Sequence, residues 1–220
     1  MLSVLQKIID AILPPRCLLC GNVLNSENGL CETCFAKIRF IGQPYCLHCG
    51  NPLPVGENLN GCPQCLNGEF DMFRFLRSRI YYENESKALI TAFKFHDKTE
   101  NAATLARLLY AAGHDIWAAG ADVLAPVPLH PSRLRYRKYN QAALLCKELR
   151  HLTGLPVNYN DLQRHKKTRP QVECSGNVRK NNVKNAFSVK DKAAFCNKRV
   201  VLIDDVMTTG ATLNECSKTL

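Results

Sequence analysis

Apolar residues recur with two different periods in the last two thirds of the chain. Helical spacing is found in 85–96, 100–113 and 140–154, and the last two of these segments end at a glycine, a common helix stop. Segment 75–83 alternates as a strand does, whereas 122–128 and 200–203 are short apolar runs. A strand without a polar face, such as 200–203, is typical of a parallel sheet that is covered on both sides. Residues 71–220 are therefore predicted to form an α/β domain with a mostly parallel sheet flanked by helices.

The first 15 residues have an amphipathic pattern of their own. One side of a helix there would carry the apolar residues, which are Leu2, Leu5, Ile8, Ile9 and Ile12. We expect a helix that packs on its own domain, and the other interpretation is a docking helix for a partner or a membrane face. The segment lacks a basic start and is interrupted by polar residues, so it does not resemble a secretory signal. No apolar run reaches the roughly 20 residues of a membrane span.

Eight of the twelve cysteines lie in four C-x-x-C pairs between residues 17 and 65. The pairs are Cys17/Cys20, Cys31/Cys34, Cys46/Cys49 and Cys62/Cys65. One such pair supplies two thiolates to a zinc ion, and a second pair completes a tetrahedral site. Gly21 and Gly50 directly follow the second cysteine of their pairs, where the chain must turn tightly around the metal. Residues 1–70 are therefore predicted to form an N-terminal helix and a double zinc ribbon with two structural zinc ions.

The pairing of the cysteines is not fixed by their spacing. We favour sequential ribbons, with the first two pairs on one ion and the last two on the other, because each ribbon then needs only a short hairpin. A cross-braced arrangement remains open. A disulfide framework is disfavoured without an export signal, and four evenly spaced pairs exceed what a redox dithiol needs. His48 is not expected to be a ligand, and the scattered cysteines are expected to be buried or partly buried: Cys146, Cys174, Cys196 and Cys216.

Positive charge is concentrated in the second half of the chain. The formal net charge is +10, yet residues 1–70 contain four Lys/Arg and five Asp/Glu, whereas 133–199 contain 17 bases and four acids. A basic stripe of this kind indicates an anionic partner, such as nucleic acid, a phosphorylated small molecule or a lipid surface. A solvated basic face is the alternative interpretation.

The stretch VVLIDDVMTTGAT, residues 200–212, combines a buried strand with unusual polar chemistry. Asp204 and Asp205 follow the strand, and carboxylates there can accept hydrogen bonds from a vicinal diol or help to hold Mg²⁺. A helix is expected to begin near Thr212, with Glu215 in a capping box, and amides at a helix start can bind an anion. Diol acceptors beside a phosphate cradle describe a site for ribose 5-phosphate.

This stretch resembles the phosphoribosyl pyrophosphate signature of type I phosphoribosyltransferases. The resemblance implies that Asp204 and Asp205 face the ribose hydroxyls. It also implies that the loop wraps the 5-phosphate through Thr208, Thr209, Gly210, Ala211 and Thr212, with Mg²⁺ accompanying the pyrophosphate. Lys94 occupies the place of a family lysine near the pyrophosphate, although a surface lysine is the alternative.

Two further segments extend the resemblance to most of the chain. The pattern PVP…R…R…NQA in 126–142 and the block 164–187 resemble the ComF/GntX family of competence and DNA utilization proteins, which joins a zinc ribbon to a phosphoribosyltransferase-like domain. The family usually has a glycine where this chain has Lys138. It also continues beyond the helix that follows the phosphate loop, so the domain at 71–220 is expected to lack the C-terminal strand.

The family resemblance implies a cytoplasmic protein that handles incoming single-stranded DNA beside the translocation machinery at the inner membrane face. Alternating cations and aromatic rings can hold phosphates and stack bases. The candidate DNA-binding residues are Arg133, Arg135, Arg137, Lys138, Tyr139, Arg164, Lys166, Lys167 and Arg169. An active phosphoribosyltransferase with an unknown acceptor is the second hypothesis, and an interaction adaptor that docks through its ribbons is the third.

Overall fold

The computed structural model describes residues 14–25, 29–56, 61–95, 98–167 and 183–220. The predicted N-terminal helix, Arg169, Cys174 and most of the block 164–187 lie outside the described residues.

A small parallel sheet stands at the centre of the α/β part. Strands β1 (Val123–Pro126) and β4 (Val200–Ile203) pair in parallel, with Val123 opposite Val200 and Pro126 opposite Ile203. Strands β2 (Leu162–Arg164) and β3 (Phe187–Val189) form a separate antiparallel pair. The strand β1 is buried throughout, but in β4 only Ile203 is buried. The predicted parallel pairing is confirmed, whereas the expectation that 200–203 is fully covered is wrong.

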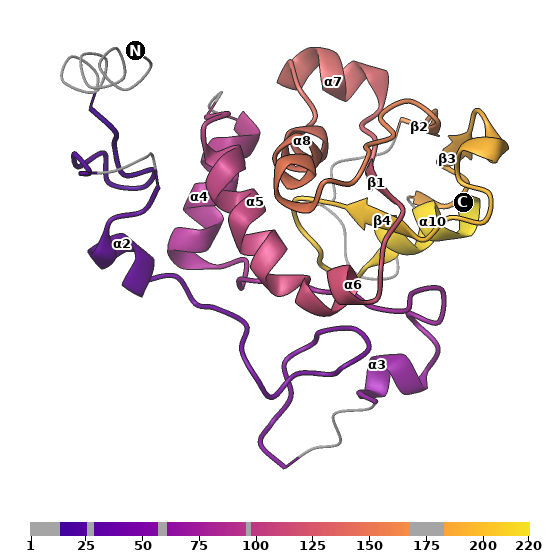
Figure 1. Ribbon diagram of the computed structural model, residues 1–220, viewed down its shortest axis with the longest axis horizontal. Helices are drawn as coiled ribbons and strands as arrows, with labels where there is room; N and C mark the ends of the chain where they lie inside the picture. The colour runs from indigo at the N-terminus through magenta and orange to yellow at the C-terminus, as the bar shows by residue number, and fades with distance from the viewer. Residues whose placement is uncertain (1–13, 26–28, 57–60, 96–97, 168–182) are drawn as a thin grey trace.

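The three helices predicted in 85–96, 100–113 and 140–154 are confirmed and form a layer beside the sheet (Figure 1). They are α4 (Asn84–Phe95), α5 (Asn101–Ala112) and α8 (Gln141–Thr153), and shorter helices are α6 (His114–Ala118), α7 (Pro131–Arg137) and the 3₁₀-helix η2 (Lys192–Ala194). The apolar faces of the three long helices meet in one core through Phe93, Leu105 and Leu149, and Leu124 of β1 closes it. Helix α10 (Ala211–Thr219) follows β4 and lies near β3.

Segment 75–83 is not a strand, contrary to the prediction. Only Ile80 makes a bridge, to Phe40, and the amide of Ile41 donates to Arg79 O at 2.9 Å. The side chains alternate because the segment runs extended against the end of the first ribbon, and a period of two reports an extended backbone whether or not a sheet is present.

The two ribbons pack on different parts of the α/β core. The first contains α2 (Glu32–Ala36) and packs through Leu18, Leu19 and Leu30 on the cluster of long helices. The second contains α3 (Pro63–Leu66), and its Cys46, Cys49 and Cys62 share a core with β1, β3 and α10. Strand β4 contributes to both cores: Val200 and Leu202 pack with the second ribbon, and Val201 and Ile203 belong to the cluster on which the first ribbon packs.

Lys138 ends helix α7 in the left-handed conformation, with φ 65° and ψ −26°. A side chain in this region costs about 1 kcal/mol, and glycine avoids the cost. We expect the free energy of unfolding of Lys138→Gly, measured by urea denaturation, to be about 1 kcal/mol higher than that of Lys138→Ala. The alanine variant is the control, because it loses the same charge and keeps the strain. Equal stabilities would show that the backbone is not strained here.

Candidate functional site

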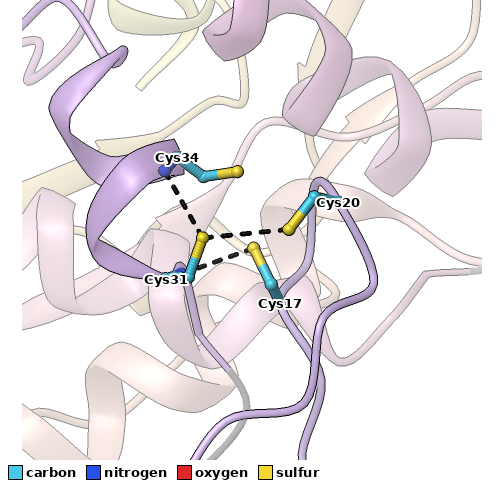
Figure 2. Close-up of side chains that lie close together, drawn as sticks. All are labelled: Cys17, Cys20, Cys31 and Cys34. Carbon is cyan, nitrogen blue, oxygen red and sulfur yellow. Dashed lines mark hydrogen bonds between the residues drawn. The ribbon is translucent and has the colours of Figure 1, made fainter.

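Two groups of four cysteines come together in the N-terminal part. Cys17, Cys20, Cys31 and Cys34 form one group, Cys46, Cys49, Cys62 and Cys65 form the other, and the sulfur atoms in each lie within 4.8 Å of one another. The sequential pairing is therefore the one found, and the cross-braced arrangement is not. Figure 2 shows the first group, in which the Sγ atoms of Cys20 and Cys31 are 3.8 Å apart.

The geometry of both groups suits zinc. Four ligands at about 2.3 Å in a tetrahedron have sulfur atoms about 3.8 Å apart. The separation of Cys46 Sγ and Cys65 Sγ is 3.8 Å, and that of Cys49 Sγ and Cys62 Sγ is 3.4 Å. In each group the loops direct backbone amides toward one thiol. Burial alone would raise the pKa of Cys17, but hydrogen bonds from amides, among them those of Cys20 and Cys31, lower it to about 6. The pKa of Cys46 is lowered to about 6 in the same way.

His48 supports the second group without joining it. Its Nδ1 lies 3.3 Å from Cys65 Sγ, and its Nε2 lies 2.5 Å from the carbonyl oxygen of Phe73. The carbonyl oxygen can only accept, so Nε2 is the donor to Phe73, while Nδ1 lies in contact with the sulfur of the cysteine. His48 therefore connects the cysteine group to the segment that leads into the α/β part, as expected of a residue outside the ligand set.

The paired carboxylates lie at the end of β4, where the prediction placed them. Lys94, from the last turn of α4, forms an ion pair with Asp205 at 2.9 Å between Nζ and Oδ1, and both side chains are mostly buried. The amide of Asp205 donates to Asp204 Oδ1 at 2.8 Å. The structure thus brings together Lys94 and the acid pair, which are more than 100 residues apart in the sequence.

Asp204 has an unusual affinity for its proton. Desolvation and the neighbouring Asp205 raise the pKa of Asp204 to about 7, against the opposing effects of its amide hydrogen bond, Lys94 and Arg164. Arg164 is only 6% exposed, and burial together with Arg133 lowers the pKa of its guanidinium. The site therefore holds two acids and two cations at one strand end, a charge pattern that can meet both hydroxyl groups and a phosphate.

Asparagine at position 204 is expected to stabilise the protein above neutral pH. The pKa of Asp204 is higher in the folded protein than in the unfolded chain, so its contribution is fully present below about pH 4 and is lost as the pH rises through 7. The free energy of unfolding of Asp204→Asn, relative to wild type, should rise by on the order of 1–3 kcal/mol between pH 4.5 and 8. Urea melts at both pH values without Mg²⁺ test this, and a difference that does not depend on pH would contradict the assigned pKa.

The loop after the acids leaves a row of amides without partners. Among the described residues, no hydrogen bond is donated by the amides of 206–211. Helix α10 begins at Ala211, with Gly210 as its N-cap at φ 69°, and no side chain caps it. The predicted capping box is wrong, because Glu215 accepts a hydrogen bond from the amide of Asn185 at 2.6 Å instead. The helix start therefore presents unpaired donors, which is the requirement for an anion site.

A cavity of about 650 Å³ runs along β4, the segment 72–82 and α5, and Asp204, Asp205 and Thr208 are among the residues that line it. Both acids therefore border this cavity at one of its ends. The loop itself encloses only about 10 Å³, the space of about one water molecule. A phosphate group bound there would require the loop to widen.

The basic residues of α7 divide into exposed and inward-facing groups. Arg135, Tyr136 and Lys138 are exposed, and Tyr136 is 80% accessible. Tyr139 packs against the helix cluster and donates from its hydroxyl to Phe93 O at 2.8 Å. Arg164 is buried beside Phe187, whereas Lys166 and Lys167 are exposed. Of the candidate DNA-binding residues, only Arg135, Lys138, Lys166 and Lys167 are therefore exposed in the part of the chain that the structure describes.

Three further residues matter at or near the site. Phe95 is 53% exposed and lies under the guanidinium of Arg137, 4.9 Å from its Cζ to the ring centroid. Phe70 is buried against Gly210, and no local pattern in the sequence marks this long-range contact. Cys196 is exposed, so the expectation that it is buried or partly buried is wrong, whereas Cys146 and Cys216 are buried as expected.

Comparison with known proteins identifies the N-terminal part and the chain as a whole. Residues 8–66 match the model of the double zinc ribbon domain. Over 211 residues the chain is 40% identical to competence protein F of Haemophilus influenzae, covering 93% of this chain and 90% of that protein. This chain belongs to the ComF family.

Other members of the ComF family are more distant but match over similar lengths. DNA utilization protein YhgH of Escherichia coli K12 is 30% identical over 94% of this chain and 91% of its own. Competence protein ComFC of Bacillus subtilis is 26% identical, over 93% of this chain and 88% of its own. No solved structure matches the chain. None of the helices in the described residues has the length and hydropathy of a membrane span.

Proposed function

We propose that this ComF-family protein supports DNA uptake and use by binding single-stranded DNA and a phosphoribosyl ligand. The observation that carries the proposal is the end of β4, where Asp204 and Asp205 border a cavity and the amides of 206–211 have no partner among the described residues. The relatives whose names refer to competence and to DNA utilization match over nearly the whole chain, which supports the biological role.

The phosphoribosyl ligand fits the order of groups along the loop. Carboxylates accept hydrogen bonds from sugar hydroxyls, and the amides at the start of α10 together with Thr208, Thr209 and Thr212 suit a phosphate. Lys94, bound to Asp205, is positioned to meet a second phosphate or to be displaced by Mg²⁺. In this proposal residues 71–220 have a phosphoribosyltransferase-like fold, and residues 1–70 form the zinc-dependent part.

Single-stranded DNA is proposed to contact the exposed face of α7. Arg135 and Lys138 supply charge, while Tyr136 and Phe95 offer exposed rings on which bases can stack. Arg133 and Arg164 lie deeper, and the guanidinium of Arg164 interacts electrostatically with the carboxyl group of Asp204. Lys166 and Lys167 extend the basic surface at the end of β2.

The DNA-binding surface is tested by charge reversal. A labelled single-stranded oligonucleotide should bind wild type with micromolar affinity, which falls steeply with salt. Arg135→Glu/Lys138→Glu should weaken binding at least tenfold and lower the salt slope by about 1.4 units, because each phosphate contact on a single strand contributes about 0.7. Lys190→Glu/Lys192→Glu is the matched control, since it changes the net charge equally at exposed positions outside α7. Equal losses of DNA-binding affinity in the two double variants would show that only the net charge matters, which would contradict the proposed surface.

A second candidate function is phosphoribosyl transfer. The buried ion pair between Lys94 and Asp205 favours it, because transfer to an acceptor requires cations and Mg²⁺ near the pyrophosphate leaving group. Pyrophosphate release in the presence of candidate acceptors, lost in Asp205→Asn, would support it.

We propose further that the protein acts in the cytoplasm, at the inner membrane face beside the translocation machinery, which crosslinking in competent cells would test. A ribbon-only fragment that binds the same partner would favour an adaptor instead.

A further inference from the structure

We infer that residues 69–77 form a bracket through which the second zinc site positions the loop 206–211. Hydrogen bonds and close contacts connect one side of this bracket to the zinc-binding turns, and packing and hydrogen bonds connect the other side to the loop and to α10. The inference rests on the proposed function for what the loop binds, but the coupling itself concerns only the position and mobility of the loop.

The zinc side of the bracket is held by several backbone contacts. His48 lies between Cys65 Sγ and Phe73 O, as described above, and its own carbonyl accepts from the amide of Leu76 at 2.9 Å. Arg77 donates to His48 O at 3.1 Å and to Leu47 O at 2.5 Å, and is paired with Asp115. Gly50 has φ 69°, and a Cβ there would lie 2.6 Å from Leu76 O. The turn that carries Cys46 and Cys49 therefore touches the bracket directly.

The loop side of the bracket is held by packing and by two hydrogen bonds. Phe70 is only 3% exposed, and a Cβ on Gly210 would lie 2.5 Å from Phe70 Cε1. Asn214 of α10 donates to Glu69 O at 2.7 Å, and Ser217 donates to Met72 O at 3.4 Å. The ring of Phe70 thus lies against the residue that starts α10, where the unpaired amides are.

The first zinc site has a less direct connection. It packs through Leu18, Leu19 and Leu30 on the helix cluster, which also contains Ile203 and Val206 at the end of β4. No hydrogen bond within the described residues joins 14–36 to 204–212. Direct contacts between two segments couple their positions more strongly than contacts made through a shared cluster. The two zinc sites should therefore differ in their effect on the loop, although their ligand sets are alike. By linkage, a ligand that holds the loop should also raise the affinity of the second site for zinc.

The test is hydrogen exchange, followed by mass spectrometry, of the full-length, zinc-loaded protein. The amides that report on the loop are those of 214–219, which are hydrogen-bonded in α10 beginning with Asn214 to Gly210 O at 2.8 Å; their exchange is called loop exchange below. Cys65→Ser should raise loop exchange at least tenfold, while Cys31→Ser, the matched change at the first site, should change it less than twofold. Equal increases in both variants, or no increase in either, would overturn the inference.

A second pair of variants keeps both zinc sites intact, so that general unfolding cannot explain the result. Phe70→Leu should keep two zinc ions per chain by mass spectrometry and still raise loop exchange several-fold. Phe35→Leu, a half-exposed ring beside Cys34 of the first ribbon, should leave loop exchange unchanged. Loop exchange at the wild-type rate in Phe70→Leu would overturn the proposed bracket.

Titration with phosphoribosyl pyrophosphate and Mg²⁺ separates this inference from the proposed function. If wild type does not bind this probe but Cys65→Ser and Cys31→Ser differ in loop exchange, the ligand assignment is wrong and the bracket stands. If the probe binds and the two variants do not differ in loop exchange, the bracket is wrong and the ligand assignment stands.

Discussion

A Cys46→Ser variant is expected to bind one zinc ion per chain instead of two and to lose the fold of the second ribbon. Structural zinc contributes on the order of 10 kcal/mol to small metal-dependent folds, and a ribbon of this length has few apolar contacts that do not involve its cysteines. Cys46, Cys49 and Cys62 are themselves part of the core shared with β1 and α10, so the loss should extend beyond the ribbon. Zinc content by mass spectrometry and the thermal midpoint by circular dichroism measure both effects.

Cys196→Ser is the control for this prediction. Cys196 is exposed and belongs to neither cysteine group, so the variant should keep two zinc ions and the wild-type thermal midpoint. A Cys46→Ser protein that retained two zinc ions and melted as wild type would show that the second group is not a structural metal site.

A Gly210→Ala substitution is expected to destabilise the protein by about 2–4 kcal/mol and to weaken binding at the loop. The cost has two parts, which are the φ of 69° and the clash of the new methyl group with Phe70 at 2.5 Å. The clash has to move either the ring or the start of α10, and the second movement turns the amides away from a phosphate. Urea denaturation gives the change in stability, and calorimetry gives the change in affinity.

Gly154→Ala separates the two parts of this cost. Gly154 ends α8 with φ 72°, nearly the same backbone conformation, but a Cβ there would meet nothing within 4 Å. It should therefore cost about 1 kcal/mol from the backbone alone and leave ligand binding unchanged. Equal losses of stability at the two positions would show that Phe70 does not constrain the loop.

Features of the chain that depend on local spacing were predictable from the sequence. The C-x-x-C pairs gave the two cysteine groups, because each site needs only neighbouring turns. Helices α4, α5 and α8 follow the apolar period of their segments, and Gly154 ends α8 as a left-handed cap. The acid pair at the end of β4 was predictable because a short apolar strand followed by polar residues has few alternatives.

Features that depend on contacts between distant segments were not predictable in the same way. The alternation in 75–83 indicated a strand, but the ribbon gives this segment only one bridge partner. Glu215 had the spacing of a capping box, but its carboxylate accepts a hydrogen bond from the amide of Asn185, which is distant in the sequence. The proximity of Phe70 to Gly210 depends on how the second ribbon packs on α10, and neither residue indicates this locally.

Isothermal titration with phosphoribosyl pyrophosphate and Mg²⁺ tests the sugar-phosphate site most directly. Wild type should bind one equivalent with micromolar affinity, and Asp205→Asn should bind at least tenfold more weakly, because the negative charge that accepts from the ribose hydroxyls and pairs with Lys94 is lost. Asp191→Asn, which changes an exposed acid outside the site, should bind as wild type. Absence of binding by wild type, or wild-type affinity in Asp205→Asn, would contradict a phosphoribosyl site at the end of β4.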